Sequence, residues 1–408
     1  MLATSCRRWL PALLAAAALP ATAANPPFEL SRSYHLPSFP AIDAGNISVV
    51  AAEVTQDGLP DLLVSFGQVP VTVFVAQPAA RGGGFQPRPL SAISGHRPPR
   101  LDRNLVAAGP PNGTGSSREI VYGDSAHGLR RLQWSGGVAN YTASSDRIEL
   151  PAYAGAVGTV AGFAVADFNG DGRSDVAVLD LPDDSHFDLR DRAVMAWGRI
   201  GASAVERSLA TVPGPYYLAV ADFTNDAAHL PDLLIANTVR DVGLSAYDPL
   251  SQQMTLRRTL TLPAATAIYS LAAGDLDGDG DADALVQYAI GGQNRWAIIE
   301  NRGAEGLVLG NTLEFGGALN HCIADFNADG IADVLVEGRT LELGLGNLRY
   351  ERTPQIAAEL TYGQACADFD GDGFIDFAVA VHADDSTMDL RIYRYVDGWD
   401  RLFANGFD

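Results

Sequence analysis

The chain has 408 residues, enough for two domains of average size, and its apolar content of 47% suits an ordinary packed core. Its formal net charge is −21, and all 28 of its basic residues are arginines. So acidic a chain is not expected to bind nucleic acid, which requires basic patches.

Residues 1–24 are typical of an export signal. Arg7 and Arg8 form a positively charged start, residues 9–19 an apolar stretch, and residues 21–23 a small-residue cleavage site. No other apolar run approaches the roughly 18 residues that a membrane-spanning helix needs. We therefore expect a bacterial protein that is secreted or periplasmic and has no membrane span.

An acidic loop recurs along the rest of the chain. Four copies carry Asp or Asn at the first, third, fifth and ninth positions and glycine at the sixth. Their candidate metal ligands are Asp167, Asn169, Asp171 and Asp175; Asp275, Asp277, Asp279 and Asp283; Asp325, Asn327, Asp329 and Asp333; and Asp368, Asp370, Asp372 and Asp376. Alternating carboxylates on a short loop can converge on one hard cation, and calcium takes six to eight oxygen ligands. We therefore expect about four calcium ions.

Short apolar segments rich in β-branched residues flank each loop, as in residues 159–181. The same acidic spacing occurs in helix–loop–helix calcium sites, but these flanks lack the 3.6-residue period of a helix. Runs of about six residues are also too short for the helices of such a site, whereas they match β-strands. The pattern therefore predicts that each loop joins two strands of a hairpin.

Three degenerate copies complete the repeat. One contains Glu53, Thr55, Asp57 and Asp61, another Asp222, Thr224, Asp226 and Asp232, and a third, near residue 109, keeps only Glu119. The first two are not expected to bind metal, because each lacks a ligand or has altered spacing. First positions fall near residues 53, 109, 167, 222, 275, 325 and 368, in steps of 43 to 58 residues. Each step accommodates one four-stranded sheet, and seven such sheets in a ring form a β-propeller.

A second pattern, late in the units, is expected to be the outermost strand. It recurs at residues 85–93, 144–151, 205–213, 255–263, 310–317 and 348–356. The last unit lacks this segment, whereas residues 28–37 have it and belong to no other unit. We therefore predict that residues 28–37 pair into the last sheet and close the ring without an open edge.

These repeats resemble those of the FG-GAP (VCBS-type) family, whose members include the heads of integrin α-subunits. The resemblance covers about residues 28–398, although the Phe-Gly element itself survives mainly as Phe66-Gly67 and Trp197-Gly198. It implies a seven-bladed propeller with calcium in the first hairpin of several blades. The expected organisation is an export signal at 1–24, one propeller at 25–398 and a tail at 399–408.

The cysteines that remain after export, Cys322 and Cys366, lie three and two residues before the loops of adjacent units. Their side chains therefore point to opposite faces of their sheets, and neighbouring sheets meet through opposite faces. A disulfide across that interface is one expectation, and two small buried apolar residues are the other.

The sequence does not indicate an enzyme. It contains no His-Glu-x-x-His zinc motif and no Gly-x-Ser-x-Gly nucleophile turn. His321 and Cys322 are adjacent in an expected strand and therefore point apart. Paired aspartates can serve glycosidases, but calcium ligation explains this spacing better. A lyase or phospholipase on a propeller, or a purely structural scaffold, remains an alternative.

A site for a protein or glycan partner is expected on the face opposite the calcium loops. Tyr216, Tyr269 and Tyr362 all lie six residues before a loop, where the innermost strand begins. Aromatic rings there can receive a cationic side chain or a sugar, as the resemblance to integrin heads also implies. His186 lies in an acidic segment expected at the rim. The alternative is that these rings only fill the channel.

Overall fold

The computed structural model describes residues 27–36, 47–55, 57–66, 72–77, 84–89, 106–109, 119–124, 128–134, 141–150, 159–182, 191–198, 206–315, 321–357, 359, 361–384 and 387–396. The predicted export signal, the tail at 399–408 and His186 lie outside these ranges. Within the described ranges, all elements are strands apart from one short 3₁₀ helix, η4 (Gly303–Glu305).

Within the described ranges, the strands pair into seven antiparallel sheets of four strands, numbered here in chain order. Sheets 1 to 3 consist of β2 (Ile47–Ala52), β3 (Asp61–Phe66), β4 (Thr72–Ala76) and β5 (Phe85–Pro89); β6 (Val106–Gly109), β7 (Glu119–Asp124), β8 (Gly128–Trp134) and β9 (Tyr141–Glu149); and β10 (Thr159–Ala166), β11 (Asp175–Leu181), β12 (Arg192–Ala196) and β13 (Glu206–Leu209).

Sheets 4 and 5 consist of β14 (Pro215–Ala221), β15 (Asp232–Asn237), β16 (Asp241–Asp248) and β17 (Gln253–Thr261); and β18 (Ala267–Gly274), β19 (Asp283–Ile290), β20 (Gln293–Asn301) and β21 (Leu307–Leu313). Sheets 6 and 7 consist of β22 (His321–Ala324), β23 (Asp333–Val336), β24 (Thr340–Gly344) and β25 (Tyr350–Arg352); and β26 (Thr361–Ala367), β27 (Asp376–Asp384), β28 (Thr387–Tyr395) and β1 (Phe28–Leu36).

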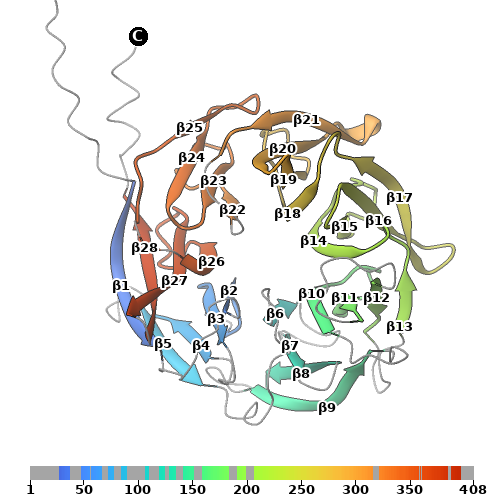
Figure 1. Cartoon of the computed structure of the whole chain (residues 1–408). Helices are drawn as coiled ribbons and strands as arrows, with labels where there is room; N and C mark the ends of the chain where they lie inside the picture. The colour runs from blue at the N-terminus through green and yellow to red at the C-terminus, as the bar shows by residue number, and fades with distance from the viewer. Residues whose placement is uncertain are drawn as a thin grey trace, which may run out of the picture.

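The sheets are arranged around a common centre (Figure 1). The first strand of each repeat lies nearest the centre and the fourth at the rim, so the predicted β-propeller architecture is confirmed. The four complete loops begin directly after innermost strands, which end at Ala166, Gly274, Ala324 and Ala367. The flanks of the loops are therefore strands and not helices, as their hydrophobic pattern predicted.

Apolar side chains fill the spaces between neighbouring sheets. The second strand of a sheet is covered on both faces, and all residues of β11 and β15 are accordingly buried. This explains why these segments are continuous apolar runs and do not alternate with polar residues. One hydrophobic cluster joins sheet 7 to sheet 1, with Ala378 and Leu390 on one side and Leu62 and Phe74 on the other.

The N-terminal strand β1 pairs with β28, the last strand of the described chain. The pairing is antiparallel and runs from Phe28 opposite Tyr395 to Leu36 opposite Met388. In Figure 1 the blue strand β1 lies beside the red strand β28. The predicted pairing of this segment with the last sheet is thus confirmed, and the edge that β28 would otherwise expose is covered.

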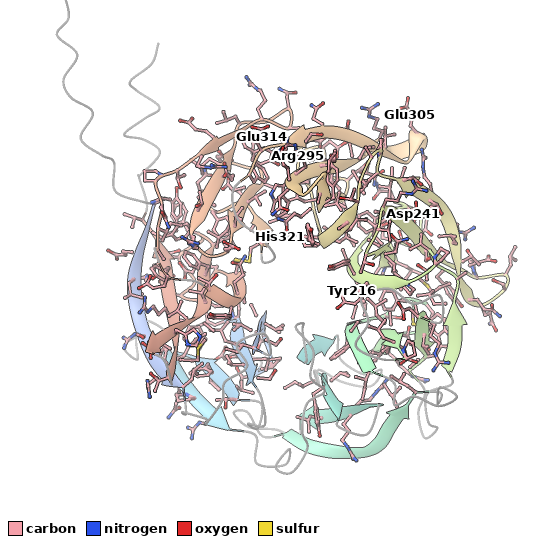
Figure 2. The ribbon with its side chains drawn as sticks, in the orientation of Figure 1. Tyr216, Asp241, Arg295, Glu305, Glu314 and His321 are labelled. Carbon is pink, nitrogen blue, oxygen red and sulfur yellow. A yellow bond between two sulfur atoms is a disulfide. The ribbon has the colours of Figure 1, made fainter. Side chains whose placement is uncertain are left out.

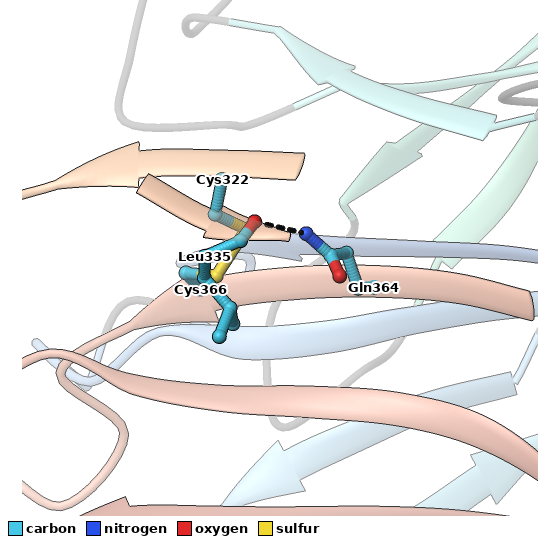
Figure 3. Close-up of a disulfide and its surroundings, with 4 residues drawn as sticks. All are labelled: Cys322, Leu335, Gln364 and Cys366. Atoms are coloured by element: carbon cyan, nitrogen blue, oxygen red, sulfur yellow. Dashed lines mark hydrogen bonds between the residues drawn. A yellow bond between two sulfur atoms is a disulfide. The ribbon is translucent and has the colours of Figure 1, made fainter. Parts of the chain in front are cut away.

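Cys322 of β22 and Cys366 of β26 form a disulfide between sheets 6 and 7 (Figure 3). Their Cα atoms are 6.3 Å apart. The side-chain amide of Gln364 also donates a hydrogen bond to the carbonyl oxygen of Leu335 across the same interface, at 3.3 Å. Of the two expectations for these cysteines, the disulfide is therefore the one realised, and it joins two sheets that are not hydrogen-bonded to each other as strands.

Within the described residues, no helix is long and apolar enough to cross a membrane.

Phe28 anchors β1 to the sheets beneath it. Its side chain is 4% exposed and makes edge contacts with the rings of Phe326, Phe377 and Tyr395 at 5.6, 4.8 and 5.4 Å. We predict that Phe28→Ala lowers the free energy of unfolding by about 3–5 kcal/mol, because it leaves a cavity among these rings.

Leu30 of the same strand is the matched control, since its side chain is 51% exposed. Leu30→Ala is expected to change the free energy of unfolding by less than about 0.5 kcal/mol. Urea denaturation at one fixed calcium concentration measures both. An effect of Phe28→Ala as small as that of Leu30→Ala would show that Phe28 does not anchor β1.

Candidate metal sites

The four complete loops join the first and second strands of sheets 3, 5, 6 and 7. Their sixth-position glycines, Gly172, Gly280, Gly330 and Gly373, have φ angles of 79°, 92°, 86° and 93°. Side chains rarely tolerate this conformation, so glycine is required where the loop turns back on itself. The turn brings the acidic positions of each loop towards one another.

The first-position carboxylate is held by the loop's own backbone. The Gly172 N–H donates to Asp167 at 2.7 Å, and the Gly280 N–H donates to Asp275 at 3.0 Å. The same bond joins Gly330 to Asp325 at 2.8 Å and Gly373 to Asp368 at 2.9 Å. A carboxylate accepts about four hydrogen bonds or metal contacts, so these bonds orient it and leave capacity for a cation.

The ninth-position aspartate connects three strands of its sheet. In sheet 5, one oxygen of Asp283 accepts the N–H of Leu276 at 2.9 Å, and the other accepts the N–H of Asn301 at 2.7 Å. Leu276 follows the first strand, Asp283 begins the second and Asn301 ends the third. The same two bonds are made by Asp175 with Phe168 and Gly198, by Asp333 with Phe326 and Gly344, and by Asp376 with Phe369 and Tyr395.

Glycine is also required at two of the third-strand positions that bond the ninth-position aspartate. A Cβ on Gly198 would lie 2.4 Å from the carbonyl oxygen of Ser174, and one on Gly344 would lie 2.4 Å from that of Ala332. Gly198 of the Trp197-Gly198 pair noted in the sequence is therefore required by the close packing at this hydrogen bond.

Carboxylates converge in two of the loops. Ligand oxygens of Asp275, Asp277 and Asp283 all lie within 4.8 Å of one another, as do those of Asp368, Asp370 and Asp376. Oxygens that bind one calcium at 2.3–2.6 Å are at most about 5 Å apart, so both groups fit this ion.

The other two loops carry asparagine at the third position. The amide oxygens of Asn169 and Asn327 accept the N–H groups of Asp171 and Asp329 at 2.9 and 3.1 Å. Asp277 makes the same bond with Asp279 at 3.1 Å, so the three loops share one conformation at this point. Amide oxygens are also calcium ligands, so Asn169 and Asn327 can take the third ligand position in their loops.

The ninth-position carboxylates of these loops are buried, which disfavours their ionised form. Burial raises the pKa of Asp283 and Asp175 from the ordinary value of 3.8 to about 7, and the neighbouring carboxylates add to the shift. Burial likewise raises the pKa of Asp376 to about 7 and that of Asp333 to about 8. A cation in the loop would offset this cost, because it favours the ionised form.

In the degenerate loops, other groups of the protein contact the acidic residues. In the loop beginning at Glu53, the Thr55 hydroxyl donates to Asp61 at 3.0 Å, and Glu53 accepts the N–H of Thr55 at 3.0 Å. In the loop beginning at Asp222, the His229 Nδ1 atom lies 2.8 Å from the Asp222 carboxylate. Neither loop offers the converged carboxylates that Asp275, Asp277 and Asp283 provide.

The three tyrosines predicted to bind a partner occupy equivalent places. The strand register shifts between Pro215 and Tyr217, between Ile268 and Ser270, and between Thr361 and Gln364. Tyr216, Tyr269 and Tyr362 therefore lie at β-bulges, at the ends of the innermost strands remote from the acidic loops. These bulges carry no recognisable sequence pattern besides the tyrosines.

The three rings differ in exposure. Tyr216, drawn on the inner side of the ring in Figure 2, is 7% exposed and packs edge-on against Tyr217 at 5.1 Å. Tyr269 and Tyr362 are half-buried, and Tyr362 also contacts the ring of His382 at 5.0 Å. Little of the Tyr216 ring is thus accessible to a partner, and most of the accessible aromatic surface belongs to the other two.

One charged partner of a predicted metal ligand was missed by sequence reasoning. Arg394 of β28 forms an ion pair with Asp370, a predicted metal ligand. No local spacing relates residues 370 and 394, because they meet through the register of the third strand.

Comparison of the chain with models of known protein families and with curated proteins found no match.

Proposed function

We propose that this protein is an exported calcium-binding β-propeller that binds a protein or glycan partner. The observation that carries the proposal is the convergence of Asp275, Asp277 and Asp283 within 4.8 Å, with the same arrangement in the last sheet. Calcium bound there would neutralise the buried carboxylates and connect the ends of the first two strands. Its role is structural, since it would hold the hairpins that shape both faces of the ring.

We further propose that the seven sheets are the blades of one FG-GAP (VCBS-type) propeller. Three observations support this assignment: the loop position between first and second strands, the four-stranded sheets, and the pairing of β1 with β28. Export would also explain the disulfide between Cys322 and Cys366, because disulfides persist in oxidising compartments. The export itself rests on the sequence of residues 1–24.

The proposed partner site lies on the face opposite the calcium loops, around Tyr269 and Tyr362. A half-buried tyrosine offers apolar area, a hydroxyl group and a π face, which suits an arginine or lysine side chain or a sugar ring. Binding proteins and propeller scaffolds can share one fold, so this part of the proposal rests on the rings and not on the architecture.

Calcium is expected to bind in the loops beginning at Asp167, Asp275, Asp325 and Asp368, with a stoichiometry of about four. Each occupied site should add about 2.7 kcal/mol to the free energy of unfolding at a free calcium concentration of 100 times Kd. At pH 7, binding should release protons, because the raised pKa values leave the ninth-position aspartates partly protonated without metal. Titration calorimetry in two buffers of different ionisation enthalpy measures the calcium stoichiometry and the number of protons released.

Asp279→Ala and Asp57→Ala form a matched pair for this test. Each aspartate is the fifth residue of its loop and accepts a backbone N–H two residues on, from Asp281 at 2.9 Å and from Leu59 at 3.0 Å. Asp279→Ala should remove one calcium ion and Asp57→Ala none. A melting temperature that is insensitive to EDTA, with no bound calcium, would refute the proposal.

For the partner site, we predict that arrays of glycans and of arginine- and lysine-containing peptides reveal a ligand that the Tyr269→Ala/Tyr362→Ala variant no longer binds. Truncating the two rings removes the accessible aromatic surface, whereas Tyr247→Ala changes a half-buried tyrosine of β16, outside the innermost strands. Tyr247→Ala should therefore bind normally. Undiminished binding by the double variant would place the partner elsewhere on the molecule.

A further inference from the structure

The acidic loop of sheet 7 contacts a cation that belongs to the protein. Arg394 extends from β28, the third strand of the sheet, and its guanidinium pairs with Asp370 and lies 3.8 Å from the carboxylate of Asp372. The side chain of Arg394 is 42% exposed, whereas that of Asp370 is 17% exposed. The guanidinium thus neutralises two predicted calcium ligands from the solvent side of the loop.

The loop of sheet 5 carries the same four acidic ligand positions without such a cation. Within the described part of the chain, no arginine or histidine forms an ion pair with the carboxylates of Asp275, Asp277, Asp279 or Asp283. The two loops therefore share their four acidic ligand positions but differ in their internal counter-charge.

The third-strand register shows what stands in place of Arg394 elsewhere. The N–H that bonds the ninth-position aspartate belongs to Tyr395 in sheet 7 and to Gly198, Asn301 and Gly344 in sheets 3, 5 and 6. The preceding residue is Arg394 in sheet 7, and it is Trp197, Glu300 or Leu343 in the other three. Among the complete loops, the basic residue at this position is therefore particular to sheet 7.

Sheet 4 provides a second example of a protein group meeting such a loop. Its loop has two additional residues, and His229 of that insertion contacts the first-position carboxylate of Asp222 at 2.8 Å. A side-chain nitrogen thus approaches the acid where the complete loops would hold metal. In sheet 7, however, the ligand set is complete, so the arginine and the metal meet at the same carboxylates.

We propose that Arg394 is an internal counter-cation that competes with calcium for Asp370 and Asp372 and makes the sheet 7 site weaker than the sheet 5 site, which has the same four acidic ligand positions. This inference rests on the proposed calcium binding. A divalent ion and a guanidinium repel each other at such distances, so calcium must displace Arg394 before it gains the carboxylate. Without calcium, Arg394 offsets the negative charge of Asp370 and Asp372. The loop belongs to sheet 7, in which β1 pairs with the last strands of the described chain.

The test is a calcium titration of Arg394→Gln, which removes the charge and keeps most of the side chain. The sheet 7 site should tighten by about tenfold or more, a change of about 1.4 kcal/mol in binding free energy per factor of ten. In EDTA the same variant should melt at a lower temperature than the unmodified protein, because the acidic loop has lost its counter-charge. Greater calcium affinity together with lower metal-free stability is a result that a merely structural role of Arg394 would not produce.

Three further variants serve as controls for this test. Arg391→Gln makes the same change in net charge on the same strand, but Arg391 pairs with Glu359 at 2.8 Å and does not touch the loop. It should leave all calcium affinities unchanged. Arg394→Lys retains the positive charge and should keep the weak site weak. In an Asp368→Asn background, which disables the sheet 7 site, Arg394→Gln should no longer alter calcium binding.

The outcomes separate this inference from the proposed function. Calcium binding that is equally tight in the unmodified protein and in Arg394→Gln would overturn the role of Arg394 and leave the calcium sites intact. An equal tightening in Arg391→Gln would also overturn it, because the effect would then come from net charge. Absence of calcium binding in every variant would overturn both proposals together.

Discussion

The structure depends on a buried aspartate at the start of the second strand in most of its sheets. Its two oxygens accept N–H groups from the ends of the first and third strands, as Asp283 does with Leu276 and Asn301. This arrangement links three strands to one carboxylate. It also buries that carboxylate, and burial raises the pKa of the Asp283 side chain. Such a carboxylate stabilises the sheet best when a cation lies beside it.

The degenerate loops show that the two roles of this aspartate are separable. Asp61 and Asp232 still accept the N–H groups of Val54 and Phe223, although their loops lack the complete ligand set. Burial raises the pKa of both to about 6, and each receives an additional hydrogen bond from a loop threonine or its backbone. Asp61 also accepts the N–H of Ala76 at the end of the third strand, so the strand-joining role is retained in the loop beginning at Glu53, where metal binding is not expected. We infer that the aspartate organises the hairpin and that calcium adds to an arrangement already in place.

Features that depend on neighbouring residues in the chain were predictable from the sequence. The loop spacing, the sixth-position glycine and the short apolar flanks predicted strand–loop–strand units, and the repeat predicted four-stranded sheets in a ring. The match of residues 28–37 to the outermost-strand pattern predicted the pairing of β1 with β28. Each of these signals is local, because strand period and turn geometry are set within a few residues.

Side-chain contacts between residues of different strands were not determined by these local patterns. The Cys322–Cys366 disulfide was one of two open expectations, because Cα separation depends on how two sheets pack. The burial of Tyr216 follows from a β-bulge and from its contact with Tyr217, neither of which has a sequence signal. The pair of Arg394 with Asp370 arises only once the third strand is in register with the loop.

The central claim is that the four complete acidic loops hold calcium, two of them through converged carboxylates. The most direct measurement is a crystal structure of the calcium-soaked protein with anomalous difference maps collected at a long wavelength. The account predicts peaks beside Asp167, Asp275, Asp325 and Asp368 and none beside Glu53 or Asp222. Well-ordered loops without anomalous peaks, or peaks confined to other parts of the ring, would contradict it.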